Sequence, residues 1–162
     1  MSEFEFNLPA RNLAPGALNE ALKTLGYPGP RLTFNRLEGY LKGFIDLVFE
    51  QSGRFFILDW KSNHLGCEPA AYGADRVAEA MAEHGYHLQS LLYTVALDRY
   101  LRLRIPGYRY ELHFGGVLYL FVRGVRPTWK MADGSAAGVH FHRPDPAAID
   151  LFNALLESDH GH

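Results

Sequence analysis

Apolar and polar residues alternate with a period of two in several short segments of the chain. The alternation over residues 4–8 predicts a strand, and apolar runs at about 39–50, 54–61, 113–123 and 139–142 predict four more. Side chains point alternately to the two faces of a strand, so residues two apart share a face. The pattern therefore predicts a sheet built from these segments.

A period near 3.6 residues replaces this alternation in other parts of the chain. Apolar residues recur at helical spacing over 86–104, and a Pro-Gly pair ends the helix that they predict. Shorter helical stretches are expected at 17–25, within 69–85 and at 146–157. Helices and strands therefore share the chain.

The order of these elements indicates an α/β fold. A strand at 54–61, a helix at 86–104 and a strand at 113–123 suggest a crossover that makes the sheet partly parallel. We expect a central mixed β-sheet flanked by helices. Residues 9–30 hold four prolines and three glycines and predict a surface excursion, and 124–138 predict an exposed loop.

Length and composition suit one domain of a reducing compartment. The chain has 162 residues, 48% of them apolar, and a single cysteine, Cys67. No apolar run reaches the roughly 18 residues of a membrane span, and the opening Met1-Ser2-Glu3 shows no secretory leader. A cytoplasmic protein is expected. The net charge of −2 argues against a strongly basic nucleic-acid binder.

Three charged residues interrupt the apolar runs and mark a candidate site. Asp46 lies within Gly-Phe-Ile-Asp-Leu-Val-Phe (43–49), and Asp59 and Lys61 lie within Ile-Leu-Asp-Trp-Lys (57–61). An unpaired buried charge costs several kcal/mol or shifts its pKa. Charges in such strands therefore require compensation, which points to metal-assisted hydrolysis.

The turn between the two runs decides whether the acids meet. A polar stretch containing Ser52-Gly53 predicts a hairpin. A two-residue or a four-residue loop places Asp46 directly opposite Asp59, whereas a three-residue loop places them on opposite faces. The site therefore depends on this register.

Two opposed carboxylates need a partner, because their Cβ atoms lie about 4.5–5.5 Å apart and like charges repel there. A shared proton or a divalent cation can offset the repulsion. The backbone carbonyl of Trp60 could add a ligand oxygen, and Lys61 adds a positive charge on the same face. A surface salt bridge between Asp59 and Lys61, worth about 0–1 kcal/mol, is the simpler alternative.

The pattern Asp…Asp-Trp-Lys resembles that of the PD-(D/E)xK nuclease superfamily. Four segments, at 41–49, 59–66, 86–101 and 113–125, are similar in this order to the C-terminal nuclease domain of the RecB family, the beta chain of exodeoxyribonuclease V. The second segment reads Asp-Trp-Lys-Ser-Asn-His-Leu-Gly, the third contains Gln-x-x-x-Tyr and the fourth begins His-Phe-Gly-Gly. Joined in order, these motifs are specific.

The resemblance implies a restriction-endonuclease-like core of type αβββαβ, here expected to lack its first helix. In the family a histidine from that helix completes the metal site, whereas the first histidine of this sequence is His64, after the motif. No phosphate-binding loop is present, so ATP would act only through helicase domains outside this chain. We expect a single nuclease domain over 1–162, as a fragment of a longer helicase–nuclease chain.

The resemblance also implies roles for individual residues. Asp46 and Asp59 would hold Mg²⁺, or Mn²⁺, with the Trp60 carbonyl assisting. Lys61 would orient or deprotonate the attacking water, or stabilise the transition state. Gln89 and Tyr93, four apart on one helix face, would support the motif or position DNA.

The implied function is hydrolysis of DNA phosphodiesters in double-strand break repair and recombination. DNA, RecC- and RecD-type subunits and the RecA recombinase are the implied partners, in the bacterial cytoplasm, with no membrane. Two alternatives stay open: a non-catalytic module that binds DNA or docks a subunit, and a stand-alone nuclease of the same superfamily.

Other polar residues carry weaker signals. His140 and His142 share a strand face, which a solvated edge strand explains better than a metal site. Trp60 and Phe56 are predicted to be core residues. Five arginines suggest contacts with a DNA backbone but more often form a solvated face: Arg99, Arg102, Arg104, Arg123 and Arg126.

Overall fold

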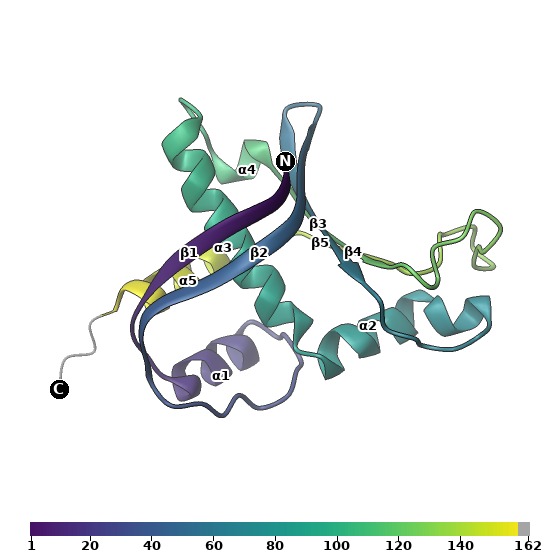
Figure 1. The fold of residues 1–162 in the computed structure, drawn as a ribbon, viewed down its shortest axis with the longest axis horizontal. Coiled ribbons are helices and arrows are strands. Elements are labelled where there is room, and N and C mark those ends of the chain that lie inside the picture. Colours follow the sequence, from purple (N-terminus) through teal and green to yellow (C-terminus); the bar gives the residue numbers. More distant parts are fainter. Residues whose placement is uncertain (159–162) are drawn as a thin grey trace.

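The computed structural model describes residues 1–158 and contains one five-stranded sheet, with its strands in chain order (Figure 1). The strands are β1 (Ser2–Leu13), β2 (Leu37–Gln51), β3 (Arg54–Lys61), β4 (Phe114–Phe121) and β5 (Val139–His142). Strands β3 and β4 are parallel and the other neighbours are antiparallel. The predicted mixed sheet and α/β class are confirmed.

Within residues 1–158, five α-helices and one 3₁₀ turn accompany the sheet. They are α1 (Pro15–Thr24), η1 (Pro69–Tyr72), α2 (Ala74–Glu83), α3 (Tyr86–Arg104), α4 (Tyr110–His113) and α5 (Pro146–Glu157). The long helix α3 has the predicted bounds. It follows β3 and precedes β4, so it belongs to the crossover that makes these two strands parallel. None of the helices in the described part combines the length and apolar character needed to cross a bilayer.

Helix α3 is the central support of the sheet. Leu91, Val95, Leu97 and Leu101 are almost fully buried, so apolar side chains cover more than one face of the helix. A helix buried on several sides must lie inside the domain. Figure 1 shows α3 crossing behind β1 and β2 with α5 beside it, and α3 thereby presents its N-terminal half to the end of β3.

The first part of the expected surface excursion at 9–30 belongs to the folded core, whereas residues 26–30 lie outside any helix or strand. Strand β1 continues to Leu13, and Leu13, Leu18 and Ala21 are buried. Two of the four prolines fit regular structure here, which the composition of the segment does not reveal. Pro9 lies in an edge strand, where a missing N–H is tolerated, and Pro15 is at the first position of α1.

Residues 124–138 form neither a helix nor a strand, but they are not simply an exposed loop. Lys130 and Ala136 form an isolated β-bridge. Ala137 is buried, and the Trp129 ring lies 6.0 Å from that of Tyr72. The segment is therefore anchored to the domain at its base, although it projects from the sheet in Figure 1.

Candidate active site

A tight turn fixes the register of the β2–β3 hairpin. Ser52 and Gly53 both have positive φ, 53° and 77°, as a two-residue type I′ turn requires. The ladder runs from Gln51 opposite Arg54 to Leu47 opposite Leu58. Asp46 and Asp59 occupy the next position along it, as the two-residue loop predicted.

The two strands separate at this position. The β2–β3 ladder ends at Leu47, while β2 stays paired with β1. Ile45 and Val48 are both buried although they are three residues apart, so the strict alternation of faces breaks between them. The Trp60 N–H donates to Asp46 Oδ2 at 2.9 Å. A carboxylate therefore takes a place that a backbone carbonyl holds in a regular ladder.

The Trp60 carbonyl lies on the same edge of β3 as Asp46. In a strand, the N–H and C=O of one residue point to the same side, and the next residue points to the other. The Trp60 N–H points to Asp46, whereas the Lys61 carbonyl accepts from Val122 N on the β4 side. The gap between β2 and β3 is thus bordered by carboxylate and carbonyl oxygens.

The side chain of Trp60 is not a core residue, contrary to the prediction. Trp60 is 49% exposed, and Phe44, on the neighbouring strand, is 52% exposed. Both alternate with residues that face α3, so they lie on the opposite face of the sheet. This face stays open beside the acidic pair.

Asp59 is a buried carboxylate with incomplete compensation. It is only 3% exposed, and burial raises its pKa above the ordinary value. Lys61 Nζ, 2.7 Å from Oδ2, opposes this rise, whereas the carboxylate of Asp46 adds to it. Apart from the ion pair, Oδ2 has no hydrogen-bond partner within residues 1–158. The site therefore favours a bound proton or an added cation.

Lys61 is held among groups that attract a cation. Its side chain is 12% exposed, and Nζ donates to Gln89 Oε1 at 2.8 Å. The ring centroids of Tyr86 and Tyr119 lie 4.0 Å and 5.4 Å from Nζ. Gln89 also accepts from the Tyr119 hydroxyl at 3.0 Å. Helix α3 and strand β4 thus fix the lysine from two sides.

Tyr93 lies one turn beyond Gln89 on α3 and close to both acids. Its pKa is raised by burial and, to a lesser degree, by the negative charges of Asp59 and Asp46. Its ring meets that of Phe6 edge to face at 5.6 Å. The structure thus brings Gln89 and Tyr93 to the acidic pair.

Two aromatic residues of this site were missed from sequence. Tyr86 opens the helix predicted at 86–104 and Tyr119 lies in the strand predicted at 113–123, and neither pattern indicates a site. Tyr119 is opposite Asp59 in the β3–β4 pairing, which a parallel alignment of the two strands could have indicated. For Tyr86 the signal was weaker, because its proximity to Lys61 depends on how α3 crosses the sheet.

Metal donors in this site are few. The described residues contain no group of three or more His, Cys, Asp or Glu side chains able to hold one ion. His64 and Cys67 are exposed. The donors that fit a hard cation are the oxygens of Asp46, Asp59 and the Trp60 backbone, a set that suits Mg²⁺ with water completing its shell.

His140 and His142 do not form a solvated edge, contrary to the prediction. Both are partly buried, and Tyr27 OH lies 2.6 Å from His142 Nε2. The His87 ring lies 6.0 Å from that of His140. Burial lowers the pKa of all three imidazoles, that of His140 to about 4. We call Tyr27, His87, His140 and His142 the histidine cluster.

Several arginines make internal contacts instead of a common cationic face. Arg99 donates to Asn153 and Glu157, and Arg102 pairs with Asp98. Arg123 donates to the Ser62 carbonyl at 2.8 Å, and Arg126 lies over the Trp129 ring. Arg123 thereby fastens the chain that follows Lys61.

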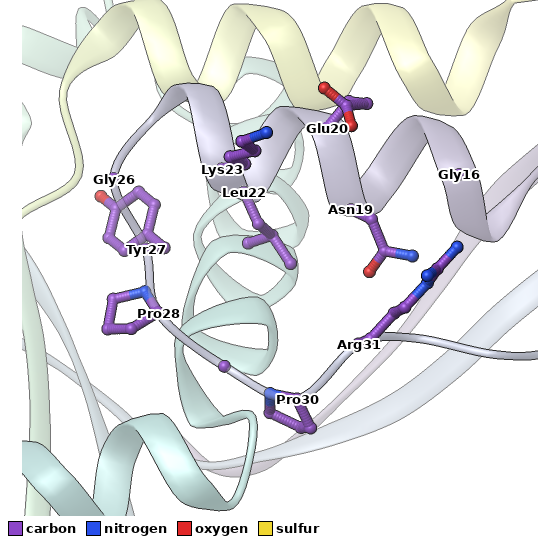
Figure 2. A pocket seen from close by; sticks show the side chains of 11 residues that line it. Gly16, Asn19, Glu20, Leu22, Lys23, Gly26, Tyr27, Pro28, Pro30 and Arg31 are labelled. Carbon is purple, nitrogen blue, oxygen red and sulfur yellow. The ribbon is translucent and has the colours of Figure 1, made fainter.

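A surface groove lies away from the acidic pair. Its volume is about 620 Å³, and it runs between α1 and the chain from Gly26 to Arg31 (Figure 2). Asn19 bridges the two walls through hydrogen bonds with the backbone N–H and C=O of Leu32. The residues that line this groove include no pair of opposed carboxylates like Asp46 and Asp59.

The chain is similar to a nuclease superfamily and to RecB subunits from several bacteria. Residues 8–157 match the PD-(D/E)XK nuclease superfamily. The RecBCD enzyme subunit RecB of Escherichia coli K12 is 44% identical over 158 residues, which cover 95% of this chain and 13% of that protein. RecB subunits of Mycobacterium tuberculosis H37Rv and Haemophilus influenzae are 45% and 40% identical, covering 75% and 86% of this chain and 11% of each relative.

The chain thus spans about an eighth of the length of its relative in Escherichia coli. The superfamily match, in contrast, extends over nearly all described residues and includes the β2–β3 hairpin, α3 and β4. On this match, the chain belongs to the PD-(D/E)XK nuclease superfamily.

Proposed function

We propose that this chain is the nuclease domain of a RecB-type protein and hydrolyses DNA phosphodiester bonds with Mg²⁺. One observation carries the proposal: Asp46 and Asp59 meet where β2 leaves β3, and Lys61 lies 2.7 Å from Asp59. Asp46, Asp59 and the Trp60 carbonyl would hold the metal. A bound divalent cation supplies an acidified water and neutralises charge on phosphate oxygens.

Lys61 has a separate role in this proposal. Its neighbours are a carboxylate, an amide oxygen and two aromatic rings, all of which attract an ammonium group. Lys61 would therefore act by donating hydrogen bonds and positive charge to the phosphate as negative charge builds in the transition state. Gln89 and Tyr93 would keep the acidic pair and the lysine in place.

The context of the activity is part of the same proposal. The relatives are named as subunits of the RecBCD enzyme, so RecC- and RecD-type subunits are the proposed partners, with DNA as substrate. A role in break repair and recombination in the bacterial cytoplasm follows, and contact with RecA rests on the family resemblance alone.

Alanine variants test the proposal directly. Asp59→Ala and Lys61→Ala should each abolish Mg²⁺-dependent cleavage of linear DNA, while circular dichroism shows an intact fold. Arg76→Ala, which breaks an exposed ion pair with Glu79, is the matched control and should cleave normally. Full cleavage by either site variant would refute the assignment.

A second candidate is a non-catalytic module that binds DNA or docks a subunit. The small set of metal donors within residues 1–158 favours it. Calorimetry separates the two functions. Binding of DNA without binding of Mg²⁺ or Mn²⁺ would establish the module, whereas metal binding that is lost in Asp46→Ala supports the nuclease.

A further inference from the structure

An aromatic stack borders Lys61. The ring centroid of Tyr86 lies 4.0 Å from Nζ, and the Tyr86 ring is nearly parallel to that of Tyr119, at 5.9 Å and 17°. The His84 ring is also nearly parallel to Tyr86, at 5.3 Å and 23°. Together with the tilted ring of Phe121 at 6.4 Å, three further rings contact Tyr86 and restrict its movement.

Tyr86 has two polar or charged contacts, made by different parts of its side chain. The ring face meets Lys61, whereas the hydroxyl donates to Asn63 Oδ1 at 3.0 Å. Asn63 lies in the segment that follows β3. The hydroxyl thus ties this segment to the start of α3, and the ring alone acts on the lysine.

Lys61 needs an anchor other than Asp59. A lysine side chain is long and flexible, and its ordering has a large entropic cost. In the proposed function Asp59 shares its carboxylate with a metal ion, which weakens its hold on the ammonium group. Gln89 Oε1, the ring of Tyr86 and, farther away at 5.4 Å, the ring of Tyr119 remain. All three are uncharged, so they hold Nζ without cancelling the charge that the phosphate requires, and Tyr86 is the nearer ring.

We propose that Tyr86 is a positioning residue for Lys61, and that its aromatic face rather than its hydroxyl holds the ammonium group beside the acidic pair. This inference rests on the proposed nuclease function for its catalytic consequence. The contact itself does not depend on catalysis and can be measured in the chain as it is.

A graded series of side chains at position 86 tests the inference. Phenylalanine keeps the ring and removes the hydroxyl, and mono-, di- and trifluorophenylalanine weaken the negative face of the ring with little change of shape. Asn63→Ala removes the same hydroxyl contact from the other side. Tyr86→Leu removes the ring, and Tyr86→Met is a second variant without a ring should the leucine variant fold poorly.

Two readouts follow the series. In NMR spectra of the chain, the ring current should move the Lys61 ε-methylene protons upfield in the parent, Tyr86→Phe and Asn63→Ala, and much less in Tyr86→Leu or Tyr86→Met. In cleavage assays, kcat should fall about tenfold in the variants without a ring, stepwise with each added fluorine, and little in Tyr86→Phe.

The outcomes separate this inference from the proposed function. An unchanged lysine resonance in the variants without a ring, or a kcat that does not respond to fluorination, overturns the positioning role. If the resonance responds as expected but neither the parent nor any variant cleaves DNA, the proposed function fails and the ring–lysine contact stands.

Discussion

The acidic pair and the histidine cluster both meet the first turns of α3, the first through Gln89 beside Lys61 and the second through His87, and both gather buried titratable groups. The two regions differ in the neighbouring groups that offset the cost of burying these titratable side chains. Asp59 has a raised pKa, a lysine partner and an oxygen without a further hydrogen bond. The imidazoles have lowered pKa values; Tyr27 satisfies His142, whereas His140 Nε2 has no hydrogen-bond partner within the described residues. Burial disfavours charge in both, but only the acidic pair opens onto a gap between strands.

The comparison teaches that a cluster of titratable residues is not by itself a site. Charge that is kept in spite of burial, next to an opening and a fixed cation, is the more informative signal. Neutral groups that satisfy one another, as Tyr27 and His142 do at 2.6 Å, are explained by packing.

Variants of the two regions should differ most in the rate of DNA cleavage. Asp59→Asn keeps the size of the side chain and removes its charge, so Mg²⁺-dependent cleavage should fall by about 10³-fold or more. Tyr27→Phe, which breaks the bond to His142, should change the rate less than about twofold. Equal losses in the two variants, measured on the same linear DNA, would remove the distinction between the regions.

Metal should stabilise the chain through the acidic pair alone. Because the pKa of Asp59 is raised on folding, the folded chain binds protons more tightly, and stability falls as pH rises above the ordinary carboxyl value of 3.8. A cation can replace the missing proton. At about 100 times its Kd, Mg²⁺ should add about 2.7 kcal/mol at pH 7, visible as a higher Tm. Tyr27→Phe should keep this gain and Asp59→Asn should lose it.

Loss of the Gln89 amide should have a smaller effect. Gln89→Leu removes an acceptor from Lys61 and from the Tyr119 hydroxyl, and a hydrogen bond to a charged group is worth about 1.5–3 kcal/mol. Cleavage should therefore fall by about 10- to 100-fold. Tyr119→Phe is the control, since it keeps the bond between Gln89 and Lys61. A greater loss in the control would place the tyrosine hydroxyl, not the amide, at the centre of the network.

The smallest expected effect is a loss of stability of the folded chain at acidic pH. The pKa of His140 is about 4 in the folded chain, against an ordinary 6.5, so the unfolded chain takes up the proton first as pH falls. The resulting stability is complete above pH 6.5 and is lost progressively down to about pH 4. After allowance for partial exposure we expect about 1 kcal/mol, or roughly 2–4 °C in Tm. His140→Phe should flatten this part of the profile, and an unchanged slope would contradict the assignment.

The hairpin and the long helix were predictable because their signals are local. Ser52-Gly53 sets the turn, the turn sets the register, and the register brings Asp46 and Asp59 together. Apolar spacing was sufficient to give α3 its bounds. Whether a proton or a metal compensates Asp59 depends on its burial and on the charges of Lys61 and Asp46, which local pattern does not specify.

The predictions were wrong for residues whose surroundings are formed by segments distant in the sequence. Pro9 lies in a strand because β2 extends far enough to pair with it, opposite Tyr40. Trp60 is exposed because it points away from Asp59 and Lys61, at the place where β2 separates from β3. His140 is partly buried because the start of α3 and Tyr27 close over β5. Spacing within a segment carries no information about such neighbours.

Because the Trp60 N–H donates to Asp46, the exchange rate of this amide proton reports the state of the acidic pair. While the carboxylate accepts it, this amide should exchange slowly with deuterated solvent although it lies at a strand end. A cation held through the other oxygen of Asp46 would leave the exchange slow, whereas one that draws the whole carboxylate away would release the proton. A single resonance in the spectrum therefore reports how the centre is occupied, without substrate and without cleavage.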